Sequence, residues 1–361
     1  MSSQRIRNAV RKLKKAGRMV LTHPRGLGDF CLSTFSALAR SEKGLGKPVF
    51  LSIEPTSACD LGCPVCETGA KVIGRPVGHM TLDRFKSVID QVKHHTNAIQ
   101  LYFMGESFLN RHIYDMVKHA KEQGITFVNI YSNGSVLDAE RAVECGLDEV
   151  NFNIGGMRQE THEIYRINSK LDRVKANILA LVEARKEAPK KSRPQINVGL
   201  IVMKQNEHEA EEFLKVVPTW GVDKAHIVDP CVRNMAQAIS MLPKNRKYWF
   251  YDERAFEQGV LRPKIIPNNR CDWIYFSSII TWNGDVVPCC RDATGKHVMG
   301  NVFQQDFGQI WNGEKYREFR RQIRTNQNGM DICALCSGFQ VPALYHPQSP
   351  SNEKSDFPLV V

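Results

Sequence analysis

The chain has 361 residues, of which 42% are hydrophobic and 24% are charged. This balance suits one large or two ordinary globular domains and excludes a disordered, collagen-like or coiled-coil protein. No apolar run approaches the ~18 residues that a transmembrane helix needs, and no apolar segment follows the basic N-terminus as a secretory signal requires. We therefore expect a soluble, cytoplasmic protein.

The formal net charge of +11 is concentrated in one segment. Residues 1–48 hold eleven Lys or Arg but only Asp29 and Glu42 as acids, which gives this segment +9 and leaves +2 for the other 313 residues. Ile6 and Val10 recur there at helical spacing, so we expect a basic helical arm. Such an arm could contact an anionic membrane surface, cap the core, touch an acidic partner or stay solvated. Nucleic acid is not expected as a partner, because the rest of the chain has no basic patch with interleaved aromatic residues.

From residue 49 onward, strand-like runs alternate with helical stretches. The expected strands are 49–55, 98–104, 126–132, 149–154, 196–203 and 225–229. The expected helices begin at Thr81, the predicted N-cap of the first, and continue at 111–123, 172–187 and 207–217. Six strands separated by helices predict βαβ units and a parallel sheet. Functional residues of such a sheet lie on loops at the C-terminal ends of its strands.

The regular alternation of strand-like and helical runs ends in the last third of the chain. Residues 232–268 are mixed and polar, which indicates a bridge between domains. Short strands at 274–281 and 285–288 flank Asn283-Gly284, a hairpin turn signal. A helix is expected at about 314–325.

A group of three cysteines, Cys59, Cys63 and Cys66, follows the first predicted strand directly. Three thiolates within eight residues can hold one face of a compact metal centre. They are one ligand short of a closed tetrahedral zinc site, whereas a four-iron cluster held by three cysteines keeps one iron open for another ligand. Half of a zinc site completed elsewhere is the alternative.

The spacing C-x3-C-x2-C after the first strand of a β/α chain resembles the radical S-adenosylmethionine (SAM) superfamily, over about residues 49–340. The resemblance implies a 4Fe–4S cluster on the three cysteines, with SAM bound at the open iron. It also implies a small-molecule substrate and an external one-electron reductant of the flavodoxin or ferredoxin type. Reductive cleavage of SAM would yield a 5′-deoxyadenosyl radical that abstracts hydrogen from the substrate. Val65 stands where the family usually has an aromatic residue, which leaves the adenine contacts open.

The same resemblance assigns SAM contacts to residues that follow the second, third and fourth predicted strands. These residues are Gly105, Glu106, Ser132, Asn133, Asn153 and Arg166. Glu106 would accept a hydrogen bond from the SAM amino group, and Arg166 would pair with the SAM carboxylate. Asn153 would suit a ribose hydroxyl. The alternatives are a solvated carboxylate at Glu106, an ordinary Asn-Gly turn at Asn133 and a solvated helix residue at Arg166.

A second group of cysteines comprises Cys271, Cys289, Cys333 and Cys336. Four thiolates can close a complete 4Fe–4S cluster or a structural zinc site. Together with the first motif and the run from Trp282 through Pro288, this group resembles the SPASM/twitch extension of radical SAM enzymes. Four suitably placed cysteines fit the shorter twitch form, which has one auxiliary cluster. Cys290 is the alternative ligand to Cys289.

The expected fold class is α/β, with a partial (β/α)6 radical SAM barrel followed by a small α+β twitch/SPASM-like iron–sulfur domain. We place the basic arm at 1–48, the radical SAM core at 49–235 and the auxiliary-cluster domain at 236–342. The Pro- and Ser-rich stretch 343–361 is expected to be a loose tail.

Relatives with a twitch domain include dehydrogenases that oxidise a carbinol of an aminocyclitol, with the auxiliary cluster as electron acceptor. The resemblance makes such an oxidation the leading hypothesis. Asp229 and Asp272 are candidates for the base or the substrate anchor, and structural roles are their alternatives. Residues 1–48 lack the strands of the recognition module that precedes the core in peptide-modifying relatives. A sugar, cyclitol or lipid-linked substrate is therefore expected before a ribosomal peptide.

Cys231 supports a second hypothesis, because it closely follows the sixth predicted strand. Radical epimerases of the superfamily use a cysteine thiol to return a hydrogen atom to the opposite face of the substrate. A buried, inert cysteine is the alternative at this position. A peptide-modifying maturase and a non-catalytic iron–sulfur electron carrier are two further alternatives for the whole chain.

Overall fold

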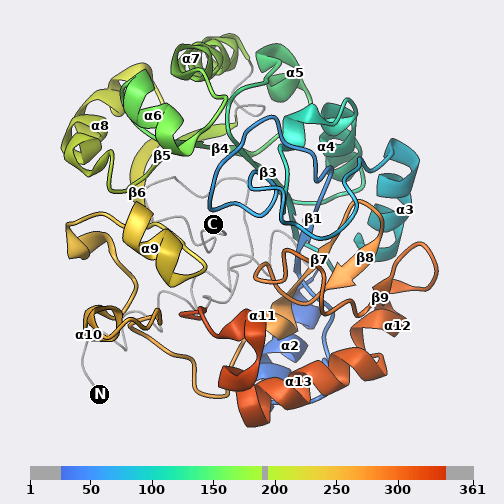
Figure 1. Cartoon of the computed structure of the whole chain (residues 1–361). Coiled ribbons are helices and arrows are strands. Elements are labelled where there is room, and N and C mark those ends of the chain that lie inside the picture. Colours follow the sequence, from blue (N-terminus) through green and yellow to red (C-terminus); the bar gives the residue numbers. More distant parts are fainter. Residues whose placement is uncertain (1–25, 189–193, 339–361) are drawn as a thin grey trace, which may run out of the picture.

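The computed structural model describes residues 26–188 and 194–338. Six parallel strands form a curved sheet with helices on its outer side (Figure 1). The strands are β1 (Phe50–Ile53), β2 (Ala98–Leu101), β3 (Phe127–Ser132), β4 (Glu149–Ile154), β5 (Gln195–Ile201) and β6 (Lys224–Val228). The connecting helices are α3 (Leu82–Val92), α4 (Ile113–Glu122), α5 (Ala139–Glu144), α6 (Gln159–Tyr165), α7 (Leu171–Glu187) and α8 (Ala210–Val216). The predicted partial (β/α)6 barrel is thereby confirmed.

The sheet continues beyond the barrel. Its order is β6-β5-β4-β3-β2-β1-β7-β8-β9, where β7 (Ser277–Ile280) pairs in parallel with β1. The strands β8 (Asp285–Val287) and β9 (Gly300–Asn301) then pair antiparallel. The C-terminal segment therefore adds its strands to the edge of the barrel sheet and does not build a sheet of its own.

Helices from both ends of the chain lie together beside this edge. They are α2 (Leu27–Ala39), α11 (Trp273–Phe276), α12 (Phe307–Trp311) and α13 (Glu314–Asn326). Figure 1 shows α2 next to α11 and α13, and the rings of Phe30 and Phe276 lie 5.3 Å apart between α2 and α11. The helix predicted at 314–325 is confirmed as α13.

The strand predicted at 274–281 is only partly correct. Residues Trp273–Phe276 form the short helix α11, and the strand begins at Ser277. All eight residues of Trp273–Ile280 are buried, and a short apolar run of this kind is compatible with helix or strand. The bridge expected at 232–268 contains two helices, α9 (Met235–Met241) and α10 (Glu253–Glu257).

Most of the predicted basic arm and the predicted tail lie outside the described residues. Residues 1–25 and 339–361 belong to this part of the chain, so the expected membrane contact of the arm lies there too. Within residues 26–188 and 194–338, none of the helices is both long and apolar enough to cross a bilayer.

Local sequence explains how the outer helices dock. Thr81 is the N-cap of α3, as predicted, and its side chain accepts a hydrogen bond from Arg84 N at 3.3 Å. One face of this helix, with Phe85, Ile89 and Val92, is fully buried against the sheet. Helices that cover the outer face in this way leave the C-terminal edge of the sheet for a site.

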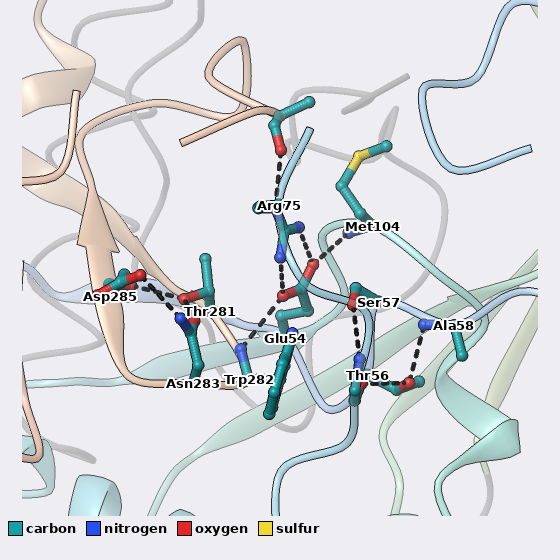
Figure 2. A network of polar contacts seen from close by, with 12 residues as sticks. Glu54, Thr56, Ser57, Ala58, Arg75, Met104, Thr281, Trp282, Asn283 and Asp285 are labelled. Atoms are coloured by element: carbon teal, nitrogen blue, oxygen red, sulfur yellow. Dashed lines mark hydrogen bonds and ion pairs between the residues drawn. The ribbon is translucent and has the colours of Figure 1, made fainter. Parts of the chain in front are cut away.

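A buried ion pair joins three strand ends at that edge (Figure 2). Glu54 directly follows β1, and its fully buried carboxylate is paired with the Arg75 guanidinium on both oxygens. The same carboxylate accepts hydrogen bonds from Met104 N, after β2, and from Trp282 N, after β7, each at 3.2 Å. Arg75 Nε donates to Ala293 O at 2.9 Å, so the network also reaches the C-terminal segment.

Replacing Glu54 with Gln removes the negative charge and leaves the Arg75 guanidinium, of which 11% is exposed, without its counter-charge. Removing one partner of a buried ion pair costs about 3–5 kcal/mol of unfolding free energy. We expect the Glu54→Gln variant to lose stability in that range. Urea unfolding followed by circular dichroism would measure it.

The matched control is Glu314→Gln, which removes an ion pair with Arg317 in which the glutamate is 70% exposed. We expect this change to stay within about 0.5 kcal/mol of the original chain. Equal losses in the two variants would mean that the Glu54 network does not hold the strand ends together.

Candidate radical SAM site

The three cysteines of the first motif lie on the loop after β1. Cys66 N donates to Cys63 O at 3.2 Å, which closes a turn between these two ligands. Gly69 is required where the chain passes back over the turn, because a Cβ there would lie 2.5 Å from Cys63 N. The loop thereby directs the side chains of Cys59, Cys63 and Cys66 toward one cavity.

That cavity has a volume of about 120 Å³ and is built largely from residues that follow strands of the parallel sheet. Its wall contains all three cysteines and every residue that was assigned to SAM from the sequence. These residues are Gly105, Glu106, Ser132, Asn133, Asn153 and Arg166. Cys231 lines the same cavity. Segments up to 231 residues apart in the chain, from Cys59 to Cys290, therefore meet at one site.

Glu106 is held in one orientation by its neighbours. Its carboxylate accepts hydrogen bonds from Asn133 N at 2.7 Å, from Ser132 Oγ at 2.9 Å and from Phe108 N at 3.2 Å. Only 2% of the residue is exposed, and burial raises the pKa of its carboxyl to about 7. A cationic amino group next to this carboxylate would favour its ionised form. The preceding Gly105, with φ of 82°, brings the chain so close that a Cβ would lie 2.5 Å from Thr56 O.

Two polar side chains in the cavity wall have buried atoms without a partner among the described residues. These atoms are Arg166 Nε and Asn153 Oδ1. The Arg166 guanidinium also lies near the first motif, since Nη1 is 3.6 Å from Cys63 Sγ. Buried polar atoms without partners are rare in folded proteins, so a ligand with an acceptor and a donor fits this wall. The carboxylate and ribose of SAM offer these groups.

The thiols themselves fit a cationic cluster. Burial raises the pKa of the Cys59 thiol to about 12 and also raises the pKa of the Cys66 thiol. Such thiols become thiolates when a metal centre supplies positive charge. The donor set of three cysteines, with Glu106 and Arg166 beside it, thus fits a 4Fe–4S cluster with SAM.

Three tyrosines in the wall were not predicted as site residues. They are Tyr102, Tyr131 and Tyr165, and the rings of Tyr102 and Tyr131 lie 5.4 Å apart. They offer aromatic surface to the ligand in a chain that has Val65 where the family usually has an aromatic residue. Tyr131 and Tyr165 directly precede Ser132 and Arg166, so their position at the ends of the motifs was the available signal.

Cys231 is 7% exposed and receives hydrogen bonds from two guanidinium groups. Arg233 Nη1 is 2.9 Å and Arg291 Nη1 is 3.0 Å from Cys231 Sγ. Arg233 Nε also donates to Glu67 at 2.7 Å, and both of these residues line the cavity. Neither arginine was predicted. Arg233 lies two residues after Cys231, whereas Arg291 reaches the same sulfur from 60 residues along the chain, which no local motif reveals.

The structure does not place the two predicted aspartates in the cavity wall. Asp229 is exposed and lies two residues before Cys231. Asp272 pairs with Arg270 at 3.1 Å and lines a separate, shallower depression beside Arg40. Their proposed roles as base or anchor therefore stay predictions without a contact to the cavity.

The four auxiliary cysteines come together at the edge of the extended sheet. Burial raises the pKa of the Cys271 thiol well above its usual value, and the charges of the three others raise it further. Cys336 N donates to Cys333 O at 3.0 Å, which closes a turn between these two cysteines. Among the described residues, no three His, Cys, Asp or Glu side chains are arranged to hold a single metal ion. Four thiols are the donor set of a complete 4Fe–4S cluster.

Cys289 and Cys290 have different surroundings. The Cys289 thiol interacts with Cys271, Cys333 and Cys336. Cys290 lines the main cavity. This placement favours Cys289 as the auxiliary ligand, as predicted, and puts Cys290 between the auxiliary group and the cavity.

Comparison with known protein families supports both motifs. Residues 53–217 match the model of the radical SAM superfamily, and residues 271–337 match the SPASM iron–sulfur cluster-binding domain. The first range contains Cys59, Cys63 and Cys66, and the second contains all four auxiliary cysteines. A radical SAM domain implies SAM and a 4Fe–4S cluster, and a SPASM domain implies additional iron–sulfur clusters.

Several known proteins are similar to this chain. A tungsten-containing aldehyde ferredoxin oxidoreductase cofactor-modifying protein of Pyrococcus furiosus is 24% identical over 299 residues, which cover 75% of this chain and 83% of the relative. An S-adenosyl-L-methionine-dependent 2-deoxy-scyllo-inosamine dehydrogenase of Niallia circulans is 34% identical over 65 residues, 18% of this chain and 26% of the relative. The crystal structure of Streptococcus suis SuiB bound to S-adenosylmethionine has a TM-score of 0.57 at 14% identity, covering 80% of this chain and 72% of SuiB. That last likeness concerns the fold.

The two family matches lie on the barrel and on its C-terminal extension, and each contains the cysteines that the structure brings together. With its fold and its two cysteine groups accounted for in this way, the chain belongs to the radical SAM superfamily and carries a SPASM-type iron–sulfur domain.

Proposed function

We propose that this chain is a radical SAM oxidoreductase that oxidises a carbinol carbon of a small molecule, namely a sugar, a cyclitol or a lipid-linked compound. One observation carries the proposal. A single cavity is lined both by the SAM-type residues and by Cys231 and Cys290, and Cys290 directly follows the auxiliary ligand Cys289 in the chain. A substrate in this cavity would lie beside the first cluster and near the auxiliary one. The similarity of 65 residues to a cyclitol dehydrogenase agrees with this reaction class.

The proposed roles follow from the contacts described above. Cys59, Cys63 and Cys66 would hold the first cluster. Glu106 would accept a hydrogen bond from the SAM ammonium, with Ser132 and Asn133 keeping its carboxylate in place. The unpartnered Arg166 Nε would donate to the SAM carboxylate, and the unpartnered Asn153 Oδ1 would accept from a ribose hydroxyl. When bound, SAM and the two clusters supply the one-electron chemistry, from 5′-deoxyadenosyl radical formation to uptake of the second substrate electron.

Partners and domain limits belong to the same proposal. We infer a flavodoxin- or ferredoxin-type reductant, the barrel at 49–235 and the auxiliary domain at 236–342. Asp229 is the better candidate for the base, because Asp272 is engaged by Arg270. The unpartnered polar atoms of Arg166 and Asn153 argue against an electron carrier without SAM chemistry, because such a protein would bind no ligand that pairs with them.

A second function is favoured by one specific observation. Cys231 lines the cavity, whereas Asp229 and Asp272 do not. A thiol in that position could return a hydrogen atom to a substrate radical, which would make the chain an epimerase with no net oxidation.

Iron content tests the assignment of both clusters. After anaerobic reconstitution we expect about eight irons per chain, falling to about four in the Cys59/Cys63/Cys66→Ala triple variant. Iron and labile sulfide analysis would measure both values. The control is Cys31→Ala, since this cysteine is exposed and outside both groups, and it should keep about eight. A fall from about four to none, with zinc at the C-terminal cysteines, would remove the proposed electron acceptor.

Glu106 links SAM affinity to pH. Because burial raises the pKa of its carboxyl to about 7, the ionised form is lost as the pH falls below that value. SAM should therefore bind more weakly to the reconstituted enzyme at pH 6 than at pH 8. Glu106→Gln should weaken binding by about tenfold to a hundredfold, equivalent to one charged hydrogen bond, and flatten this pH profile. Equilibrium dialysis would show it, and an unchanged profile in the variant would remove Glu106 from the SAM contacts.

Cys231→Ala separates the two functions. On a substrate that supports 5′-deoxyadenosine formation, an oxidation should continue in this variant, because the thiol is not needed for electron loss. An epimerisation should lose inversion, because no other hydrogen-atom donor is proposed. Product analysis in deuterated water would distinguish them. Deuterium at the reacting carbon of the original enzyme's product, lost in the variant, would establish the epimerase.

A further inference from the structure

The strongest unexplained feature of the cavity is the pair of guanidinium groups at Cys231. Both Arg233 and Arg291 donate to the same sulfur, at 2.9 and 3.0 Å, so their donating nitrogens lie within about 6 Å of each other. Two cations at this distance repel each other unless negative charge lies between or beside them. The arrangement therefore calls for a counter-charge.

The described carboxylates supply only part of that charge. Glu67 pairs with Arg233 at 2.7 Å. None of the carboxylates in the described part of the chain forms an ion pair with Arg291, whose only side-chain hydrogen bond given by the structure is to Cys231. Burying a cation without a carboxylate partner is energetically unfavourable, and a bound anion would compensate its charge.

The position of these groups identifies the ligand as part of the substrate. Arg233 and Cys231 line the same cavity as Glu106 and Arg166, which are assigned to SAM, and Arg291 adjoins the cavity through its hydrogen bond to Cys231. Guanidinium groups bind the oxygens of carboxylates and phosphates through paired hydrogen bonds. Each arginine has donors beyond the nitrogen that is bonded to sulfur, so each can bind such an oxygen.

We propose that Arg233 and Arg291 form a subsite for an anionic group of the substrate, a carboxylate or a phosphate, seated against Cys231. This proposal rests on the proposed function, because it takes the cavity to be the substrate site. It narrows the substrate class from any sugar, cyclitol or lipid-linked molecule to one that carries an oxyanion next to its reacting carbon. A phosphorylated sugar, a sugar acid and a phospholipid-linked compound all meet this requirement.

Alkylation of Cys231 in the reconstituted holoenzyme, without SAM, tests the subsite directly. Iodoacetamide modifies the thiol, and mass spectrometry of the Cys231 peptide gives the rate. Inorganic phosphate or acetate is the added probe. We expect at least one of the two anions to slow modification by fivefold or more, and the effective anion indicates whether the substrate oxyanion is a phosphate or a carboxylate.

Variants show where the anion binds. Arg291→Gln and Arg233→Gln should each lose most of the protection, whereas Arg291→Lys should keep part of it because the charge remains. The control Arg246→Gln changes an arginine whose partners are Glu253 and Glu257, and it should keep full protection. Iron content shows that each variant is folded and loaded.

Either of two results would overturn the proposal. One is that neither anion slows the modification, which would mean that Arg291 serves the charge of the auxiliary cysteines instead. The other is that protection survives in both Arg→Gln variants, which would place the anion elsewhere. Formation of 5′-deoxyadenosine is not needed for this test, so a failure of the proposed oxidation would not be mistaken for a failure of the subsite.

Discussion

The buried ion pair between Glu54 and Arg75 is the constraint on which the site depends. A carboxylate with no exposed surface is tolerated only when its oxygens are fully engaged, and here they are engaged by Arg75, Met104 N and Trp282 N. These partners belong to the loop after the cysteine motif and to the ends of β2 and β7 (Figure 2). None of them can move without breaking a bond to a buried charge. Met104, which lines the cavity, is thereby fixed relative to the ends of β1 and β7.

The pairing of strands at this edge also explains how the auxiliary cysteines come to lie near the cavity. Because β7 pairs in parallel with β1, the first strand of the C-terminal segment is a seventh parallel strand of the barrel sheet. The hairpin that follows carries Cys289 toward the auxiliary cysteines and Cys290 toward the cavity. Arg75 Nε, bound to Ala293 O, fixes the stretch just beyond them. A flexible linker between two separate domains could not hold the cysteines at a fixed separation from the substrate.

Local motifs account for what could be predicted from the sequence. The six strands follow from short apolar runs, and the N-cap Thr81 follows from its place just before an amphipathic helical run. The residues of the SAM wall lie in short patterns at the ends of strands, which parallel topology brings together. Ile274–Phe276 was predicted as strand because an apolar run has no period that separates helix from strand. Asp229 and Asp272 were chosen for residue type and chain position, which do not reveal where a side chain points. Arg233, Arg291 and Glu54 act through partners far along the chain, so no local pattern contains them.

Charge then decides what the cavity can accept. Burial raises the pKa of the Cys59 and Cys66 thiols, which need the positive charge of iron to ionise. The carboxylate of Glu106 and the guanidinium of Arg166 match the two charged ends of an amino acid, and SAM ends in such a group. With these groups accounted for, the cation of Arg291 is left without a carboxylate partner among the described residues. An anionic substrate would give that cation a counter-charge and would be held against Cys231. Electrostatics would thus select the substrate and orient it with the same two arginines.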